Sequence, residues 1–158
     1  MDFDVPFEIY FPTREAWLEG SVTRPSEIGI YTDGSKMDCG VGSGIFSEHY
    51  NTELSFRLND DCSVFQAEVF GILKAAEAMR DVSGSDISFY IDSQAAIRAV
   101  GSNNIRSSIV KLCRGFLKEL ALQNNVRLCW VPGHQGHSGN EKADELARIG
   151  SESQMDAT

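Results

Sequence analysis

Alternating apolar and polar residues predict three β-strands in the first third of this 158-residue chain. The first strand begins at Ile28 and stops at the Asp-Gly-Ser sequence 33–35, which is typical of a turn. Two further strands are predicted at 41–46 and 52–57, and the polar residues 48–51 between them suit a hairpin. These segments predict an antiparallel meander.

Helical periodicity begins after the third strand. Apolar residues recur at steps of four and three from Phe65 to Met79, which predicts an amphipathic helix that Asp61 or Ser63 could cap. The remaining predicted elements are, in chain order, a strand at 87–91, a short helix at 95–100, a helix at 103–123, a strand at 126–131 and a last helix after residue 139.

The order of elements indicates an α/β fold with a mixed five-stranded sheet flanked by helices. Three antiparallel strands come first, and the two later strands are reached through helical crossovers. Because such crossovers join parallel strands, we expect the first, fourth and fifth strands to be parallel.

Residues 1–25 lack a regular pattern and contain three prolines and several aromatic residues. They are predicted to be an extended lead-in or linker segment, followed by one domain at 26–152 and a tail at 153–158. Two other possibilities stay open for the lead-in. Its aromatic residues could fold back onto the domain, or pack against a neighbouring domain of a longer polypeptide.

Composition favours an intracellular globular protein, placed in the nucleus or the cytoplasm. The chain is 42% hydrophobic, and no apolar run is long enough to cross a membrane, so no membrane association is expected. Acidic residues follow Met1 where a secretory signal would be basic and then apolar. The cysteines form no C-x-x-C pair and are predicted to be reduced structural thiols. They are Cys39, Cys62, Cys113 and Cys129.

Four carboxylates carry the candidate chemistry. Asp33 and Asp92 each end a predicted strand, whereas Glu68 and Asp144 lie on predicted helices. If the two strands are neighbours, their aspartates stand about 5 Å apart, the spacing of paired strands. Taken singly, each acid could equally be a turn former, a helix cap or a solvated residue. Together they predict a site for two Mg²⁺ ions and phosphoryl-transfer chemistry of the nuclease or polymerase kind.

Five short motifs stand in an order that resembles the motif set of type I ribonuclease H, across roughly residues 27 to 150. They are Thr32-Asp33-Gly34-Ser35, Ala67-Glu68, Ile91-Asp92-Ser93-Gln94, Gly133-His134-Gln135-Gly136-His137 and Ala143-Asp144-Glu145-Leu146-Ala147. Three longer stretches most resemble the ribonuclease H domain of non-LTR (LINE-type) retrotransposon polyproteins. These are Tyr31 to Lys36, Phe65 to Glu68 and Trp130 to His134.

The resemblance implies a ribonuclease H-like fold and hydrolysis of the RNA strand of an RNA/DNA hybrid. Its catalytic and metal-binding residues would be the four acids Asp33, Glu68, Asp92 and Asp144. The implied cofactor is Mg²⁺, as two ions, for which Mn²⁺ could substitute. One ion would activate water and the other would stabilise the leaving 3′ oxygen. His134 matches the mobile-loop histidine of the family, which is thought to aid proton transfer or product departure, whereas His137 fits a structural role at the helix entrance.

Hybrid recognition requires contacts with the 2′-hydroxyls that a wide, shallow minor groove exposes. Gly34, Ser35 and Gln94 match substrate-contacting positions of the family, and Asn140 is a weaker candidate because an Asn at a helix start is often a cap. The family often has Asn or Gln just before the helix of the catalytic glutamate, where this chain has Val64 and Phe65.

The charge of the chain bears on its affinity for nucleic acid. With 23 acidic and 14 basic residues, the formal net charge is −9. The basic protrusion of several cellular family members is also absent, since the connection from residue 99 to residue 106 is short. We therefore expect weak, salt-sensitive binding of hybrids, and a reverse transcriptase domain on the same polyprotein is the expected partner that holds the substrate.

Two alternatives remain open from the sequence. The first is another nuclease, or a transposase-like integrase, on the same fold; the Gly-His-x-Gly-His loop and the late Asp-Glu-Leu-Ala helix favour ribonuclease H instead. The second is a catalytically weak domain that binds hybrids or serves as a spacer in a reverse transcriptase polyprotein. The presence of all four acids argues against the second.

Overall fold

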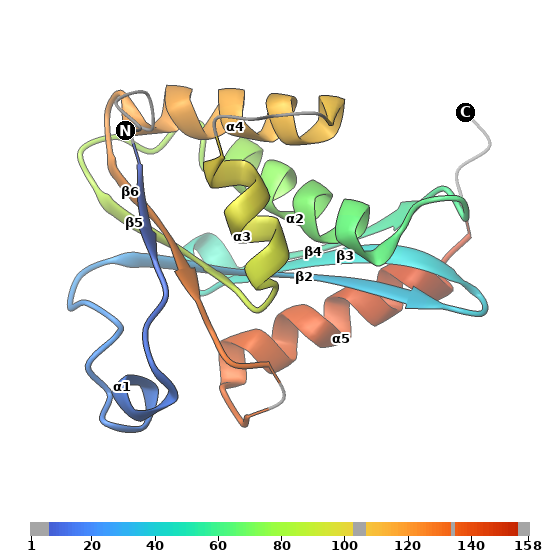
Figure 1. Cartoon of the computed structure of the whole chain (residues 1–158), viewed down its shortest axis with the longest axis horizontal. Helices are drawn as coiled ribbons and strands as arrows, with labels where there is room; N and C mark the ends of the chain where they lie inside the picture. Colours follow the sequence, from blue (N-terminus) through green and yellow to red (C-terminus); the bar gives the residue numbers. More distant parts are fainter. Residues whose placement is uncertain (1–6, 103–106, 134, 155–158) are drawn as a thin grey trace.

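The protein is described by a computed structural model over residues 7–102, 107–133 and 135–154. Figure 1 shows one mixed sheet with helices on both faces, and the sheet has six strands in the order β1-β6-β5-β2-β3-β4. The elements in chain order are β1 (Glu8–Tyr10), α1 (Arg14–Leu18), β2 (Ile28–Met37), β3 (Gly40–Ser47), the 3₁₀ helix η1 (His49–Asn51), β4 (Thr52–Leu58), α2 (Val64–Ala78), β5 (Asp86–Ile91), α3 (Gln94–Gly101), α4 (Ser108–Ala121), β6 (Asn125–Trp130) and α5 (Ser138–Glu152).

The predicted α/β architecture is confirmed, but the predicted number of strands is wrong. The meander β2-β3-β4 is antiparallel, and β2, β5 and β6 are parallel, as expected. The sixth strand is β1, which pairs in parallel with β6 and places Ile9 opposite Leu128. Three residues are too few to show an alternating pattern, so this strand is defined by the edge of β6 on which it forms.

Strand β2 is longer than its sequence pattern predicts. It continues through the Asp-Gly-Ser sequence to Met37, because β3 pairs with it as far as Met37 opposite Gly40. The parallel pairing of β2 with β5 ends earlier, at Thr32 opposite Ile91. The point where β5 stops and β2 continues therefore lies immediately before Asp33 and Asp92.

Helices cover the two faces of the sheet unequally (Figure 1). Helices α2, α3 and α4 lie on one face, over a core that includes Ile30, Ile72 and Phe89. Helix α5 lies on the other face, against β2, β3 and β4. It packs closely because a Cβ at Gly42 or Gly44 would collide with the backbone of α5.

Helix α2 begins where the sequence indicates. Ser63, one of the two predicted caps, accepts a hydrogen bond at Oγ from the backbone N–H of Gln66 at 3.1 Å, and the Ser63 N–H donates to Gln66 Oε1 at 2.8 Å. This reciprocal capping box fixes the first turn of the helix. The first turn leads directly to Glu68.

Residues 7–24, predicted to be part of a linker, instead fold back onto the sheet. Phe7 is buried in the main core, and Val22 is buried beside Tyr90 and Cys129, with Trp17 packed against them. Trp17 and Val22 thus cover part of β5 and β6. Of the possibilities left open by the sequence, the fold-back is the one that the structure shows.

The covered face contains a buried polar network. Ser88 donates a hydrogen bond to Glu27 at 2.6 Å, and the Tyr90 hydroxyl also donates to Glu27. Arg127 is paired with Glu27 at 3.5 Å and donates to the carbonyl oxygen of Val22 at 2.6 Å. Polar side chains of β5 and β6 are thus satisfied by Val22 and by Glu27, which precedes β2.

The four cysteines are free thiols. Cys113 and Cys129 are buried, and burial raises the pKa of each thiol to about 12, which keeps them protonated. The burial of these two agrees with the prediction of mostly structural thiols, whereas Cys39 is exposed and Cys62 is half-buried.

None of the helices within the described parts of the chain is both long and apolar enough to span a membrane.

Candidate active site

Asp33 and Asp92 are brought together by the register of two parallel strands. Thr32 lies opposite Ile91 as the last pair between β2 and β5, so each aspartate is the next residue on its strand. Their carboxylates belong to a group whose ligand atoms all lie within 4.8 Å of one another. The sequence-based spacing of about 5 Å rested on the same argument of neighbouring strands.

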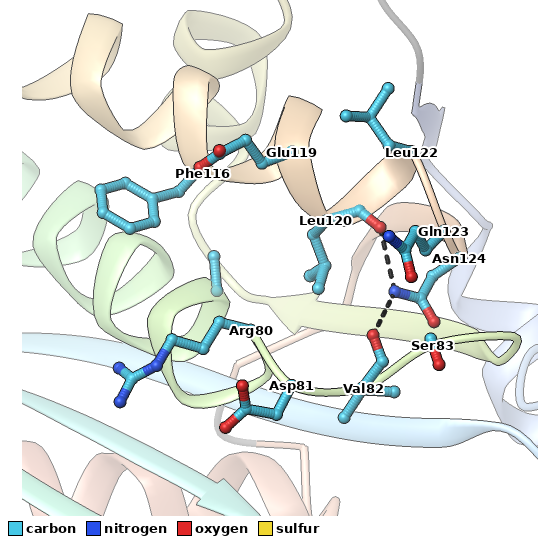
Figure 2. Close-up of a pocket in the computed structure, with 11 residues that line it drawn as sticks. Arg80, Asp81, Val82, Ser83, Phe116, Glu119, Leu120, Leu122, Gln123 and Asn124 are labelled. Carbon is cyan, nitrogen blue, oxygen red and sulfur yellow. Dashed lines mark hydrogen bonds between the residues drawn. The ribbon is translucent and has the colours of Figure 1, made fainter.

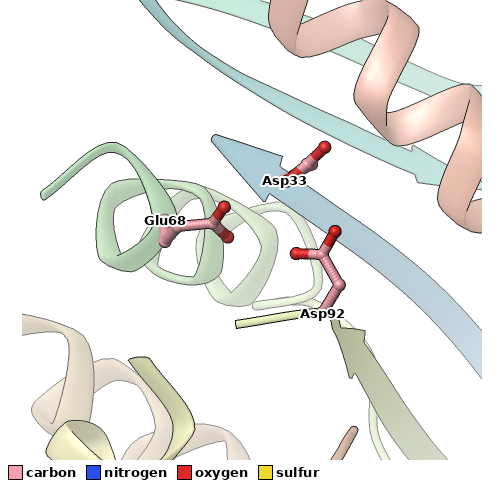
Figure 3. Close-up of side chains that lie close together, drawn as sticks. All are labelled: Asp33, Glu68 and Asp92. Atoms are coloured by element: carbon pink, nitrogen blue, oxygen red, sulfur yellow. The ribbon is translucent and has the colours of Figure 1, made fainter. Parts of the chain in front are cut away.

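Glu68 completes this group of three carboxylates, which we call the acid cluster: Asp33, Glu68 and Asp92. Figure 3 shows the three side chains gathered at one place, with Asp33 on β2, Glu68 reaching in from α2 and Asp92 from the end of β5. Helix α2 approaches β2 closely at this point. A Cβ on Gly34 would lie only 2.7 Å from the backbone nitrogen of Glu68, so only glycine leaves room for the approach.

The acid cluster is electrostatically strained when it holds no cation. Asp33 is 5% exposed and Glu68 is 7% exposed. Burial, then the charges of Glu68 and Asp92, raise the pKa of Asp33 far above its ordinary value. Burial and the charge of Asp92 likewise raise the pKa of Glu68, against hydrogen bonds from Asp33 and Gly34 that lower it.

The donor set fits a hard divalent cation. Each member offers a carboxylate oxygen, the ligand that Mg²⁺ and Mn²⁺ prefer. Glu68 Oε2 is buried and has no hydrogen-bond partner within the described residues, although buried carboxylate oxygens are normally satisfied. A bound cation would satisfy that oxygen and neutralise the repulsion between the three acids.

Asp144 lies beside the acid cluster but not within it. Its side chain, on α5, is 17% exposed and accepts a hydrogen bond from Arg148 one turn later. An interaction with Asp144 is among the smaller causes that raise the pKa of Asp33, so the two side chains are close. Arg148 is a residue that the sequence reasoning missed. The Asp-to-Arg spacing of four on a predicted helix was the available signal.

The predicted substrate-binding residues lie on β2, α3 and α5. Gly34 and Ser35 follow Asp33 on β2, and Gln94 is the first residue of α3; all three are half-buried. Asn140 is buried on α5, and its side-chain amide donates to Asp92 Oδ2 at 3.4 Å. Asn140 is therefore not the helix cap, a position that His137 occupies. Contacts of these four residues with substrate stay a prediction.

The loop after β6 borders the site. A Cβ on Gly133 would lie 2.9 Å from Asp92 Oδ2, which places the start of the loop against that carboxylate. His134, the predicted catalytic histidine, lies outside the described residues. His137 begins α5 and packs its ring on Trp17 with 4.8 Å between ring centroids, in keeping with the predicted structural role.

Gly34→Ala is expected to disturb the acid cluster. The added Cβ would meet the α2 backbone on both Ala67 and Glu68, so β2 and α2 must separate. We expect the free energy of unfolding, measured by urea denaturation, to fall by about 1–3 kcal/mol, as for other overpacked sites. Cleavage activity should fall with it, because Glu68 moves.

Gly71→Ala is the matched control, on the helix α2 that Gly34 of β2 faces. A Cβ there would make only ordinary contacts, the nearest at 3.4 Å from the carbonyl oxygen of Asp33. Replacing a helix-interior glycine by alanine should leave stability unchanged or raise it by up to about 1 kcal/mol. Equal losses in Gly34→Ala and Gly71→Ala would show that the close approach at Gly34 is not critical.

A cavity of about 430 Å³ lies away from the acid cluster, between the ends of α2 and α4 (Figure 2). There the Asn124 side-chain amide donates to the carbonyl oxygens of Val82 at 2.8 Å and Leu120 at 3.0 Å. Asn124 thus closes the turns that border the cavity. Ala76, which lines it, is eight residues beyond Glu68, about 12 Å along the helix axis.

Comparison of the sequence with known proteins identifies a family and several similar proteins. The family described as RNase H matches residues 25–152. A protein named ribonuclease H from Francisella philomiragia subsp. philomiragia is 29% identical over 144 residues, covering 81% of this chain and 93% of that protein. A ribonuclease H of Francisella tularensis subsp. novicida is 29% identical over 145 residues, covering 78% of this chain and 90% of that protein.

Proposed function

The chain belongs to the RNase H family and is a hydrolase that acts on RNA/DNA hybrids, and we propose that it cuts the RNA strand internally with two divalent metal ions. The ligands would be Asp33, Glu68, Asp92 and Asp144, and the ions Mg²⁺, with Mn²⁺ as a substitute. The observation that carries the proposal is the acid cluster, in which Asp33 and Glu68 are buried and one oxygen of Glu68 lacks a partner among the described residues.

Residues of this chain would position the metal-binding acids for this reaction. Bound cations would activate a water for attack on phosphorus and offset charge on the leaving 3′ oxygen. Gly34 lets Glu68 approach Asp33, and Asn140 holds one oxygen of Asp92 through its side-chain amide. Arg148 holds Asp144 on the exposed side of α5 and so orients the fourth acid. His134 is proposed to assist proton transfer or product departure.

Selection of a hybrid is proposed to rest on polar groups beside the acid cluster. Ser35, Gln94 and Asn140 come from three different elements that border it. Ser63 and Gln66, which precede Glu68, bond to each other in the capping box, and Val64 between them is exposed. We therefore propose that residues of β2, α3 and α5 contact the substrate, rather than residues at the start of α2.

We further propose that the domain acts during reverse transcription of a non-LTR retrotransposon, inside the cell, in the nucleus or the cytoplasm. Support comes from the sequences of two motifs, Tyr31 to Lys36 and Trp130 to His134, which resemble those of such retrotransposons. The net charge of −9 is a second support, since a domain that repels phosphate benefits from a reverse transcriptase domain that holds the substrate on the same polyprotein.

Purified protein tests the proposal directly. With Mg²⁺ or Mn²⁺ at low salt, we expect cleavage of RNA in an RNA/DNA hybrid, with 5′-phosphate and 3′-hydroxyl products, and no cleavage of single-stranded RNA or duplex DNA. Asp92→Asn should abolish the cleavage. Cutting of duplex DNA would favour another nuclease on this fold. Hybrid binding without cleavage, at low salt and with either metal, would favour a spacer or binding domain.

A further inference from the structure

The N-terminal segment lies against the elements that carry the metal-binding acids. Residues 7–24 precede the region matched by the family, yet they add β1 to the edge of the sheet and place α1 over β5 and β6. Figure 1 shows α1 near the end of β6 and the start of α5. Residues outside the matched range therefore lie close to β6 and α5, which border the site.

Trp17 makes the central contacts of this segment. Its indole N–H donates to the carbonyl oxygen of Trp130, the last residue of β6, at 2.9 Å. Its ring packs on Tyr90 with 5.5 Å between ring centroids and on His137 with 4.8 Å. One side chain thus contacts both ends of the loop between β6 and α5.

Trp130 extends this contact to the acid cluster. Its indole N–H donates to the backbone carbonyl oxygen of Asp92 at 3.3 Å. The backbone N–H of the next residue, Val131, donates to Ile91 at 3.0 Å. Arg14, at the start of α1, places its guanidinium 5.6 Å from the Trp130 ring centroid. The position of Asp92 is therefore linked through Trp130 to Trp17.

A second route runs through α5. His137, which packs on Trp17, is the residue from which α5 begins. That helix carries Asn140, which contacts Asp92, and Asp144 one turn later. The same indole therefore contacts the end of β6, where Trp130 bonds to Asp92, and the start of α5, which carries Asn140 and Asp144.

We infer that residues 7–24 are a positioning element of the active site, with Trp17 as its principal positioning residue. The inference rests on the proposed function, because it concerns the geometry in which the acids hold metal and substrate. Trp17 does not touch the reacting atoms; it fixes the end of β6 and the start of α5. Catalysis is sensitive to displacements of this kind, since a shift of about 1 Å at a reacting group can cost roughly 100-fold in rate.

Trp17→Phe is the decisive variant. The phenyl ring keeps most of the packing on Tyr90 and His137, but the hydrogen bond to the carbonyl oxygen of Trp130 is lost. We expect kcat on the hybrid to fall about 3- to 10-fold with KM changed less than about twofold, because geometry and not substrate contact is altered. Thr13→Ala, which removes the side-chain cap of α1, should lower kcat about two- to threefold without touching the core.

Val126→Ala is the matched structural control. Val126 is buried in the main core at the opposite end of β6 from Trp130, so its truncation lowers stability without reaching the site. We expect its kcat to equal that of the parent protein. If Trp17→Phe and Val126→Ala change kcat equally at similar urea midpoints, the positioning role is excluded and only a structural role remains.

A metal-binding measurement separates this inference from the proposed function. Trp17 and Trp130 are the only tryptophans of the chain, so in Trp17→Phe the fluorescence of Trp130 alone reports on the backbone of Asp92. The full chain is titrated with Mn²⁺ and binding is measured by calorimetry and by fluorescence. We expect the dissociation constant for Mn²⁺ to be about three- to tenfold higher in Trp17→Phe than in the parent. This difference is expected whether or not the parent cleaves hybrids, and equal Mn²⁺ affinities would overturn the inference. Cleavage by the parent decides the proposed function separately.

Discussion

Asp33→Asn is expected to abolish hybrid cleavage and, at the same time, to stabilise the metal-free protein. Asp33 is 5% exposed and shares the acid cluster with Glu68 and Asp92. Loss of a central ligand should lower the rate by on the order of 10³ or more, since a bound metal contributes several kcal/mol of transition-state stabilisation. Activity is measured on the hybrid with saturating Mn²⁺.

The stabilising effect has a separate cause. Without a cation, burial and the neighbouring acids oppose ionisation of Asp33, and they raise its pKa. Asparagine keeps the oxygen that accepts the hydrogen bond from the N–H of Gly34 at 2.9 Å but removes the charge. We expect the free energy of unfolding in EDTA at neutral pH to rise by about 1 kcal/mol or more, the equivalent of roughly one pKa unit.

Asp38→Asn provides the comparison. Asp38 is exposed in the turn that follows β2, so its replacement should change neither cleavage nor stability appreciably. A loss of metal-free stability in Asp33→Asn would contradict the interpretation, because it would mean that the carboxylate is held by favourable partners inside the protein. Retained cleavage in the same variant would exclude Asp33 as a ligand.

The second large effect concerns pH and metal together. The ordinary carboxyl pKa values are 3.8 for Asp33 and 4.5 for Glu68, and both are raised in the folded protein. A group whose pKa is raised on folding binds protons more tightly in the folded state. Its stabilising effect is complete below the unfolded-state pKa and is lost as the pH rises through the folded-state value. Metal-free stability should therefore fall from about pH 4 upward into the alkaline range.

Divalent metal should reverse this loss. At pH 8, Mg²⁺ or Mn²⁺ at about 100 times its dissociation constant would stabilise the folded protein by roughly 2.7 kcal/mol. For a protein of this size that corresponds to an increase in Tm of several degrees, about 5–10 °C. Thermal unfolding with EDTA and with metal, from pH 4 to pH 9, measures both effects.

The double variant Asp33→Asn/Glu68→Gln isolates the contribution of the acid cluster from the general repulsion of a chain with net charge −9. Without metal, the difference in free energy of unfolding between the double variant and the parent should grow in favour of the variant as the pH rises. Added metal should no longer raise the Tm of the variant. Identical pH profiles for the double variant and the parent would show that the acids do not limit stability. A metal effect that persists in the double variant would place the cation elsewhere.

The sequence predicted the elements and the approach of the acids to one another, because both depend on short-range patterns. The periodicity from Phe65 to Met79 and the Ser63 cap locate α2, and the alternation in β5 and β6 locates the parallel strands. Since neighbouring parallel strands end at the same edge, Asp33 and Asp92 could be expected side by side.

Other features depend on contacts between residues far apart in the chain. β2 passes through an Asp-Gly-Ser sequence that looks like a turn, because β3 continues to pair with it. β1 has three residues and forms on the edge of β6. Trp17 meets Trp130 across 113 positions of sequence. No local pattern specifies such pairings.

The amino-acid sequence by itself determined the order of strands and helices, the candidate metal ligands and the family motifs, since these are written in residue type and spacing. Only the tertiary structure decided that three acids form the acid cluster while Asp144 is paired with Arg148, and that residues 7–24 cover the sheet. The physical reason is that side-chain direction and burial depend on which surfaces meet. Local propensities do not specify which surfaces meet. Long-range packing and hydrogen bonding select one arrangement.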